Sequence, residues 1–216
     1  MKPEKRAPLD RGRVADVALR LLNETGLEGL TLRAIARELD VKAPALYWHF
    51  KDKQALLDEM ATEMYRRTIA GAALDPADTW RERLLKINRH LRGALLGYRD
   101  GARVFSGSRF TGTEHAPELE ANLRLLTESG LTLAQAVHAG RTTHLYTLGF
   151  VTEEQGVRPF PDDPGEGYDL EERARRLAEY PLAAAAGKLL FDDWDRQFEE
   201  GLELLLAGIA ARYGIG

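Results

Sequence analysis

The chain of 216 residues contains no cysteine. Disulfides, thiolate metal sites and cysteine nucleophiles are therefore excluded. The chain also lacks an uncharged apolar run approaching the length of about 18 residues that a transmembrane helix requires. No apolar segment follows the first basic residues, as one would in a secretory signal. We therefore expect a cytoplasmic protein that has no membrane partner.

Motifs of the common enzyme classes are missing as well. The histidines never stand at the His-x-x-x-His spacing of a helical metal site, and neither Gly-x-Ser-x-Gly nor a glycine-rich phosphate loop occurs. The acidic pairs Glu153-Glu154 and Asp192-Asp193 are adjacent, so their side chains would diverge on a helix. The sequence therefore predicts a protein that is not an enzyme and has no metal site or other cofactor.

The composition is that of a globular protein, with 44% hydrophobic and 30% charged residues. The net charge of −4 is unevenly distributed, because residues 1–53 hold more Lys and Arg than Asp and Glu, whereas the remainder is acidic. A basic N-terminal quarter on an acidic chain favours a small module that meets an anion such as nucleic acid. So small an excess can also arise by chance.

Helical periodicity runs through the chain, and no alternating apolar–polar segment long enough for a strand stands out. Asp10 and Thr31 are suitable N-caps for two helices, the first of which should end near Gly26. A short helix is expected at 43–49, and Asp52 should cap a longer one that reaches about residue 70. Later helices are expected from Trp80 to Leu95, from Asp100 to Phe105, and at 115–129, 132–154, 181–192 and 194–213, with a loop over 156–168.

The predicted fold class is all-α, with a helix-turn-helix DNA-binding domain over 1–53 and a larger helical domain over 54–216. The helix at 194–213 is apolar around more than one face, so it needs a second partner besides its own core. The helix at 132–154 carries small residues that allow close packing. We expect these two helices to form a homodimer; the alternative is a deeply buried helix in a monomer.

The second and third predicted helices are joined by a tight break, as in a helix-turn-helix, whose second helix enters the major groove of DNA. Two large aromatic residues, Tyr47 and Trp48, lie on the outer side of that short helix. They are costly to expose unless a groove covers them. Two lysines follow, placed for phosphates, and the helix start at Thr31 also suits a phosphate. The residues expected at DNA are Thr31, Arg33, Pro44, Ala45, Tyr47, Trp48, His49, Lys51 and Lys53.

The segments Gly29–Leu39 and Ala45–Leu57 resemble the TetR family of transcriptional repressors. The resemblance continues into the core, where Ala94–Val104, the Trp80 helix and Phe198–Leu206 are similar to the tetracycline repressors. It implies an Ω-shaped homodimer with two DNA-reading heads, a palindromic operator, and a core at 54–216 that binds a small-molecule effector. The positions that it places at DNA are Arg33, Ala43, Pro44, Ala45, Tyr47, His49 and Lys53.

Two departures from the family pattern affect DNA reading. Asp40 stands at the turn where family members commonly have glycine, and aspartate tolerates the left-handed conformation better than most residues. Ala43 and Ala45 replace polar base-reading residues, and alanine can contact only a thymine methyl or another apolar edge. The turn should therefore survive, and the base preference should differ from that of the tetracycline repressors.

The tetracycline repressors hold a drug–magnesium chelate, and the resemblance places Phe105, Ile69 and Ile87 at their metal- and drug-binding positions. None of these side chains can ligate magnesium, which requires oxygen ligands in octahedral geometry; Glu153 matches an acidic position but is not a site alone. We therefore expect a largely apolar or aromatic ligand without metal. The candidate ligand-binding residues are Ile69, Leu84, Ile87, Asn88, Leu91, Phe105, Arg109, Phe110, Arg141, His144, Leu145, Thr147, Leu148 and Phe150.

Arg109 is the expected polar anchor, because it follows Phe105 by one helical turn. Any single apolar residue of this set can equally be plain core, and His144 can equally be a hydrogen-bonded structural histidine. The predicted function is a repressor that binds an inverted-repeat operator as a homodimer and is released by ligand. The alternative is a DNA-binding regulator without small-molecule control. The effector and the operator sequence do not follow from these residues.

Overall fold

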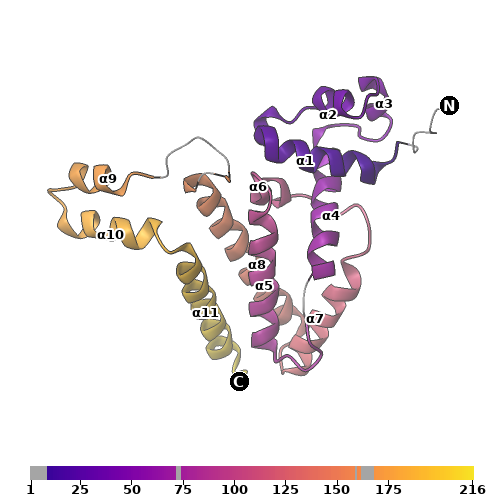
Figure 1. Ribbon diagram of the computed structural model, residues 1–216. Helices are drawn as coiled ribbons and strands as arrows, with labels where there is room; N and C mark the ends of the chain where they lie inside the picture. The colour runs from indigo at the N-terminus through magenta and orange to yellow at the C-terminus, as the bar shows by residue number, and fades with distance from the viewer. Residues whose placement is uncertain (1–8, 72–73, 159, 162–167) are drawn as a thin grey trace. The chain divides into compact units, whose positions relative to one another are not determined.

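The computed structural model describes residues 9–71, 74–158, 160–161 and 168–216, and these residues form helices and no strand (Figure 1). The helices are α1 (Arg11–Gly29), α2 (Leu32–Glu38), α3 (Ala43–Tyr47), α4 (Lys53–Gly71), α5 (Trp80–Leu96), α6 (Gly101–Phe105), α7 (Ala116–Glu128), α8 (Leu133–Val157), α9 (Leu170–Arg176), α10 (Pro181–Phe191) and α11 (Trp194–Tyr213). The predicted all-α class is confirmed for this part of the chain. None of these helices is long and apolar enough to cross a membrane.

The chain divides into two compact units. The first unit comprises Met1–Ala72 and Gly93–Glu118, and the second comprises Ala73–Arg92 and Leu119–Gly216. The first contains α1 to α4 and α6, whereas the second contains most of α5 and α7 and all of α8 to α11. The domain boundary expected after Lys53 falls at the start of α4. The division into a DNA-binding domain and a ligand-binding domain at this residue stays a prediction.

Local sequence signals begin and end the helices of the first unit. The side chains of Asp10 and Thr31 accept hydrogen bonds from the N–H groups of Arg13 and Ala34, so both are the N-caps that the sequence predicts. Gly26 (φ 68°) interrupts the regular geometry of α1, although helical turns resume up to Gly29. The helix therefore kinks at the expected stop and ends three residues later.

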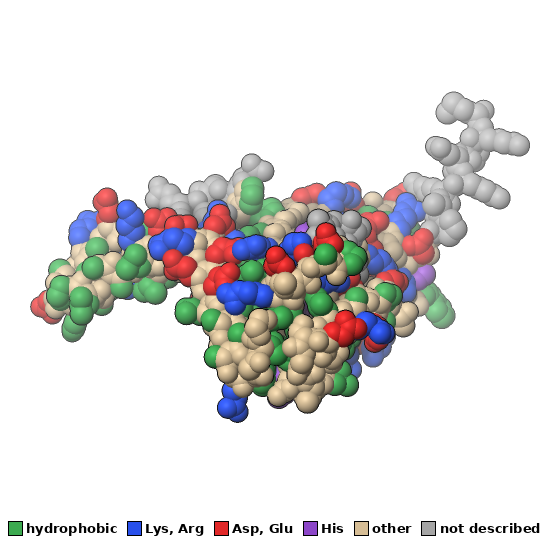
Figure 2. Space-filling model, turned by 90° about the horizontal axis from the view of Figure 1, so that it is seen from below, with side chains coloured by type: hydrophobic (Ala, Val, Ile, Leu, Met, Phe, Trp, Pro, Cys, Tyr) green, Lys and Arg blue, Asp and Glu red, His purple; other side chains and the backbone are tan. Residues whose placement is uncertain are grey.

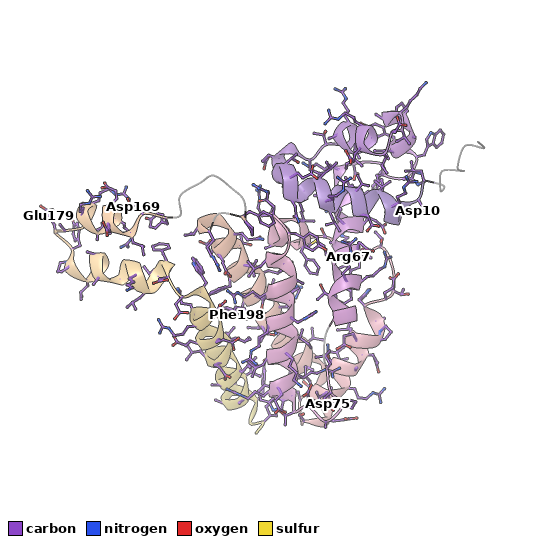
Figure 3. The ribbon with its side chains drawn as sticks, viewed as in Figure 1. Asp10, Arg67, Asp75, Asp169, Glu179 and Phe198 are labelled. Atoms are coloured by element: carbon purple, nitrogen blue, oxygen red, sulfur yellow. The ribbon has the colours of Figure 1, made fainter. Side chains whose placement is uncertain are left out.

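The second unit is built on a core that α5, α8 and α11 share. Phe198 on α11 is fully buried, and its ring packs against Tyr146 and Phe150 of α8 at 5.6 and 5.3 Å between centroids (Figure 3). Trp80 at the start of α5 donates its indole N–H to the carbonyl of Gly216 at 2.8 Å, which holds the C-terminus to this core. The apolar core is Trp80, Leu84, Leu85, Leu126, Leu131, Ala136, Ala139, Phe198, Leu202, Leu206, Ile209 and Ile215.

A buried ion pair joins the same three helices. Arg92 of α5 donates from Nε and Nη2 to the two carboxylate oxygens of Glu154 on α8, each at 2.8 Å. Its Nη1 reaches Asp195 of α11 at 2.7 Å, and the guanidinium carbon lies 5.1 Å from the centre of the Phe198 ring. Arg158 also contacts Glu154, at 2.7 Å. The buried charge is thus balanced from two sides.

α9 and α10 pack against each other as a pair. α9 was not expected from the sequence, because Leu170–Arg176 is mostly charged and none of its residues is buried. α10 leaves several large apolar side chains exposed, and Figure 2 shows apolar side chains gathered at the left of the view, over α9 and α10. The exposed large side chains are Tyr180, Leu182, Leu189 and Leu190. Of the loop expected over 156–168, residue 159 and residues 162–167 lie outside the described chain, and α8 covers its first two residues.

Candidate DNA-binding surface and ligand site

A tight turn joins α2 to α3 in the first unit. Asp40 adopts the left-handed conformation (φ 52°), as the sequence predicts for this position. The N–H of Val41 donates to the carbonyl of Ala36 at 2.9 Å and closes the end of α2. Pro44 occupies the first turn of α3, where no N–H is needed. The geometry is that of a helix-turn-helix.

Two fully buried side chains, Leu46 and Phe50, anchor α3 to its unit. Arg11 of α1 lies over the Phe50 ring, with 4.6 Å from the guanidinium carbon to the ring centre, and donates to the carbonyl of His49 at 2.6 Å. Its Nε is 2.7 Å from the buried carboxylate of Glu59 on α4. Sequence reasoning missed Arg11, since only the fold brings these partners together. Arg11 therefore links the C-terminal end of α3 to α1 and α4.

The outer side of α3 carries the residues predicted to meet DNA. Tyr47 is 58% exposed and Trp48 is 90% exposed, both unusual for aromatic residues. Pro44 is exposed beside them. Ala43, Ala45 and His49 are half-buried at the margin of this face. The first unit thus presents two large exposed rings at α3, whose opposite side is anchored by Leu46, Phe50 and Arg11.

Charged and polar residues flank this aromatic face. Thr31 and Arg33, at the start of α2, are exposed, and so is Lys51. Lys53 is also exposed, but its ammonium donates to the carbonyl of Leu27 at 3.1 Å. A phosphate contact by Lys53 would therefore compete with a bond within the protein. Lys51 Nζ also lies 4.0 Å from the Asp52 carboxylate, and the Thr31 hydroxyl already accepts from the N–H of Ala34 at 3.1 Å.

The end of α1 is tied to the turn between α5 and α6. Asp100 (φ 56°) accepts from the N–H of Leu27 at 2.8 Å, and Arg99 donates its N–H to the side chain of Asn23 at 2.9 Å. Arg103 pairs with Glu28 at 2.9 Å. The sequence marked Arg99 and Asp100 only as a turn, because their partners lie more than 70 residues away. A shift of α6 would thus move the end of α1 through these contacts.

Four rings converge between α4, α6 and the start of α7. Phe110 lies 4.6 Å from Tyr65, 5.6 Å from Phe105 and 5.3 Å from His115, between ring centres. Phe105 is buried. Burial and the nearby Glu118 carboxylate raise the pKa of the Tyr65 phenol. We call these four residues the aromatic cluster. Phe105 and Phe110 were predicted from the sequence as ligand-binding residues, whereas Tyr65 and His115 were not.

Hydrogen bonds to α4 hold Phe110 in this position. The N–H of Arg109 donates to Asp58 at 3.0 Å, and the N–H of Thr111 donates to the hydroxyl of Thr62 at 2.9 Å. α6 ends at Phe105, and Ser106 is extended (ψ 126°). The helical turn that was expected to link Phe105 with Arg109 therefore does not exist. The exposed Arg109 side chain stays a predicted anchor without that support.

The other predicted ligand-binding residues lie in the second unit, apart from Ile69. Asn88 of α5 is buried, accepts a hydrogen bond from the Thr147 hydroxyl at 2.7 Å and donates to the carbonyl of Leu84 at 2.8 Å. Burial and the positive charge of Arg141 lower the pKa of His144. Leu91 and Leu148 are buried, Ile87 and Phe150 are half-buried, and Arg141 and Leu145 are exposed. The Ile69 side chain lies outside the described residues.

The helices, their order and the helix-turn-helix match known regulators along most of the chain. Residues 14–60 match the model of the bacterial regulatory proteins of the tetR family, and residues 72–213 match that of the tetracyclin repressor-like C-terminal domain. The chain belongs to the TetR family. The class A tetracycline repressor of transposon 1721 from Escherichia coli is 39% identical over 203 residues, which cover 92% of this chain and 89% of that protein.

Two solved structures are similar over nearly their whole length. A TetR variant from Acinetobacter baumannii in complex with minocycline is 32% identical, with a TM-score of 0.73 and coverage of 95% of this chain and 99% of that one. BioQ with its natural double-stranded DNA operator is 31% identical, with a TM-score of 0.67 and coverage of 94% and 99%. Both the reading head and the core therefore have relatives of known structure.

Proposed function

We propose that this protein is a ligand-responsive transcriptional repressor, not an enzyme, which binds a palindromic operator as a homodimer. The observation that carries the proposal is the exposed pair Tyr47 and Trp48 on a short helix, held from behind by the buried Leu46 and Phe50. The major groove gives such rings apolar edges and phosphates as partners. The operator complex of BioQ supports this reading of the family's N-terminal domain.

Base reading should fall mainly to Tyr47 and Trp48. Ala43 and Ala45 replace polar readers and offer only methyl groups, which suit thymine. Arg33 and Lys51 contact the backbone, which positions the protein without selecting sequence. The operator therefore has thymine-containing steps opposite the start of α3 and differs from the operators of the tetracycline repressors.

The homodimer forms through α8 and α11. α11 buries Phe198, Leu202 and Leu206 on one face, yet Leu204 on another face is 74% exposed. α8 likewise exposes Leu133, Val137 and Leu145. Apolar side chains exposed along two helices mark a contact surface. A two-fold dimer over this surface matches the two-fold symmetry of a palindromic operator.

A small molecule can release the protein from DNA only if it binds one conformation more tightly than another, and the two conformations must differ in the position of the DNA-binding heads. α4 leaves the reading head and packs against α6, whose preceding turn is hydrogen-bonded to α1. A ligand that moves α6 therefore acts on both α4 and α1. The complex of a similar TetR variant with minocycline supports control by a small molecule.

The ligand binds without magnesium. The resemblance places Phe105 at the family's metal-binding position and Ile87 at an asparagine position of the family, and neither side chain has an oxygen or nitrogen that fits the ion. The aromatic cluster instead offers ring faces and edges. We propose a flat, largely apolar molecule as the effector.

Binding to DNA from the gene's own upstream region, measured by footprinting and fluorescence anisotropy, tests the function. We expect an inverted repeat to be protected and affinity to fall steeply with salt. Saturating effector should weaken operator binding at least tenfold. Salt-insensitive binding, or no binding to any palindrome, would exclude the proposed repressor, and operator affinity that is unchanged or tightened by effector would exclude release.

A further inference from the structure

His115 carries a buried nitrogen that has nothing to bind. Its Nδ1 is the only buried side-chain nitrogen or oxygen without a hydrogen-bond partner among the residues that the structure describes. The ring belongs to the aromatic cluster, 5.3 Å from Phe110 and 6.4 Å from Tyr65 between centres. Buried polar atoms are nearly always paired, so this exception needs a reason.

Packing alone does not explain a histidine at this position. A phenyl ring would fill the same space beside Phe110 and Tyr65 without burying an unpaired nitrogen. Elsewhere the fold pairs its buried polar side chains, as with Asn88 and Thr147. An unpaired nitrogen inside a group of rings is the arrangement that orients an aromatic ligand by one polar contact.

The charges around the cluster decide which ligand group suits this nitrogen. Glu114 precedes His115 directly and pairs with Arg66 at 3.0 Å, so the Arg66 charge is already balanced. Glu118, one helical turn further, acts on Tyr65. The surroundings are acidic, which disfavours a carboxylate ligand and favours a neutral group. A phenolic hydroxyl is neutral and donates to the unprotonated nitrogen of an imidazole, which is Nδ1 when the ring proton of His115 is on Nε2.

We propose that His115 Nδ1 accepts a hydrogen bond from the hydroxyl of a neutral, planar aromatic ligand that packs among Tyr65, Phe105 and Phe110. This inference rests on the proposed ligand control and adds the ligand's chemical class and the residue that selects it. His115, and not Arg109, is then the polar anchor. The hydrogen bonds from the loop to Asp58 and Thr62 keep the rings in place for stacking.

Three size-matched probes test the proposal by calorimetry on the full-length protein: 2-naphthol, 2-methoxynaphthalene, which lacks the donor, and 2-naphthoate, which carries a charge. We expect 2-naphthol to bind about tenfold more tightly than either, which corresponds to one hydrogen bond. Equal binding of 2-methoxynaphthalene, tighter binding of 2-naphthoate, or no binding of 2-naphthol would overturn it. These comparisons need no variant.

The variant His115→Phe keeps the ring and removes the nitrogen. It should lower the affinity for 2-naphthol about tenfold and change that for 2-methoxynaphthalene less than about twofold. Its Tm should stay equal or rise, since the lost nitrogen had no partner; equal losses for both probes, or a fall in Tm, would indicate a structural role and contradict the proposal. His138→Phe, at an exposed position of α8, is the matched control.

Operator affinity of the same proteins without probe separates the two proposals. A protein that binds its operator but does not prefer the hydroxyl refutes only the role of His115. A protein that prefers 2-naphthol through His115 but binds no operator refutes the repressor and leaves the ligand site standing.

Discussion

Removing the Arg92 side chain should destabilise the fold far more than removing its exposed partner. Glu154 is 0% exposed, and in the variant Arg92→Met it would lose two hydrogen bonds of 2.8 Å. Breaking a buried pair from one side costs about 3–5 kcal/mol. Arg158 still contacts Glu154 at 2.7 Å, so we expect the lower end, about 3 kcal/mol.

Two further variants test whether the loss of stability comes from leaving the buried Glu154 charge unpaired. Asp195→Ala removes an acceptor whose side chain is 85% exposed and should cost less than about 1 kcal/mol. The double variant Arg92→Met/Glu154→Leu removes both buried charges together and should lie within about 1 kcal/mol of the wild type. Urea unfolding at one fixed protein concentration gives the three values, because dimerisation also affects stability. If Arg92→Met lowers the free energy of unfolding by no more than Asp195→Ala does, the Arg92–Glu154 pair is not a buried contact that stabilises the fold.

Three other outcomes follow from the DNA-binding surface, the ligand site and His144. Tyr47→Ala should weaken specific operator binding far more than nonspecific binding, whereas Lys51→Ala should weaken both about equally; competition with unrelated DNA distinguishes them. EDTA should leave effector affinity unchanged in calorimetry, and an affinity that vanishes with EDTA would contradict the metal-free site. The pKa of His144 is lowered from its ordinary value of 6.5. The folded state then binds fewer protons than the unfolded state, so the free energy of unfolding should fall as pH drops below 6.5, less so in His144→Gln.

Most of the helices could be predicted because their signals are local. Asp10 and Thr31 cap the helices that they precede, and Asp40 forms a left-handed turn, each within four residues of its partners. α9 escaped prediction for the same reason, since a charged segment with no buried face has no apolar periodicity. A helix can be predicted when its apolar residues recur with helical periodicity along the chain. A helix that buries few apolar side chains lacks this periodicity.

The candidate sites were predictable only in part. The exposure of Tyr47 and Trp48 follows from helix periodicity, which also buries Leu46 and Phe50. The ligand site depends on where α6 stops. Helical spacing placed Arg109 beside Phe105, but α6 ends at Phe105 and the chain continues in an extended conformation.

The burial of Phe105 decides which substitution of this residue gives an informative test. Phe105 is 6% exposed and packs edge-on against Phe110, so Phe105→Ala would open a cavity in the first unit. Such truncations cost about 3–5 kcal/mol of stability. An effect on ligand affinity could then not be told apart from loss of the fold. Phe105→Leu keeps most of the volume and is the better variant for calorimetry.

The buried polar groups of the two units have different energetic roles. In the second unit, Arg92 and Glu154 satisfy each other, so this buried pair offers no unpaired charge to a ligand. In the first unit, His115 Nδ1 is left without a partner, at a cost of about 1–3 kcal/mol for a buried polar atom. A ligand hydroxyl at this nitrogen would recover that free energy only while bound. Binding energy is therefore available next to α4 and α6, the helices through which release of DNA is proposed.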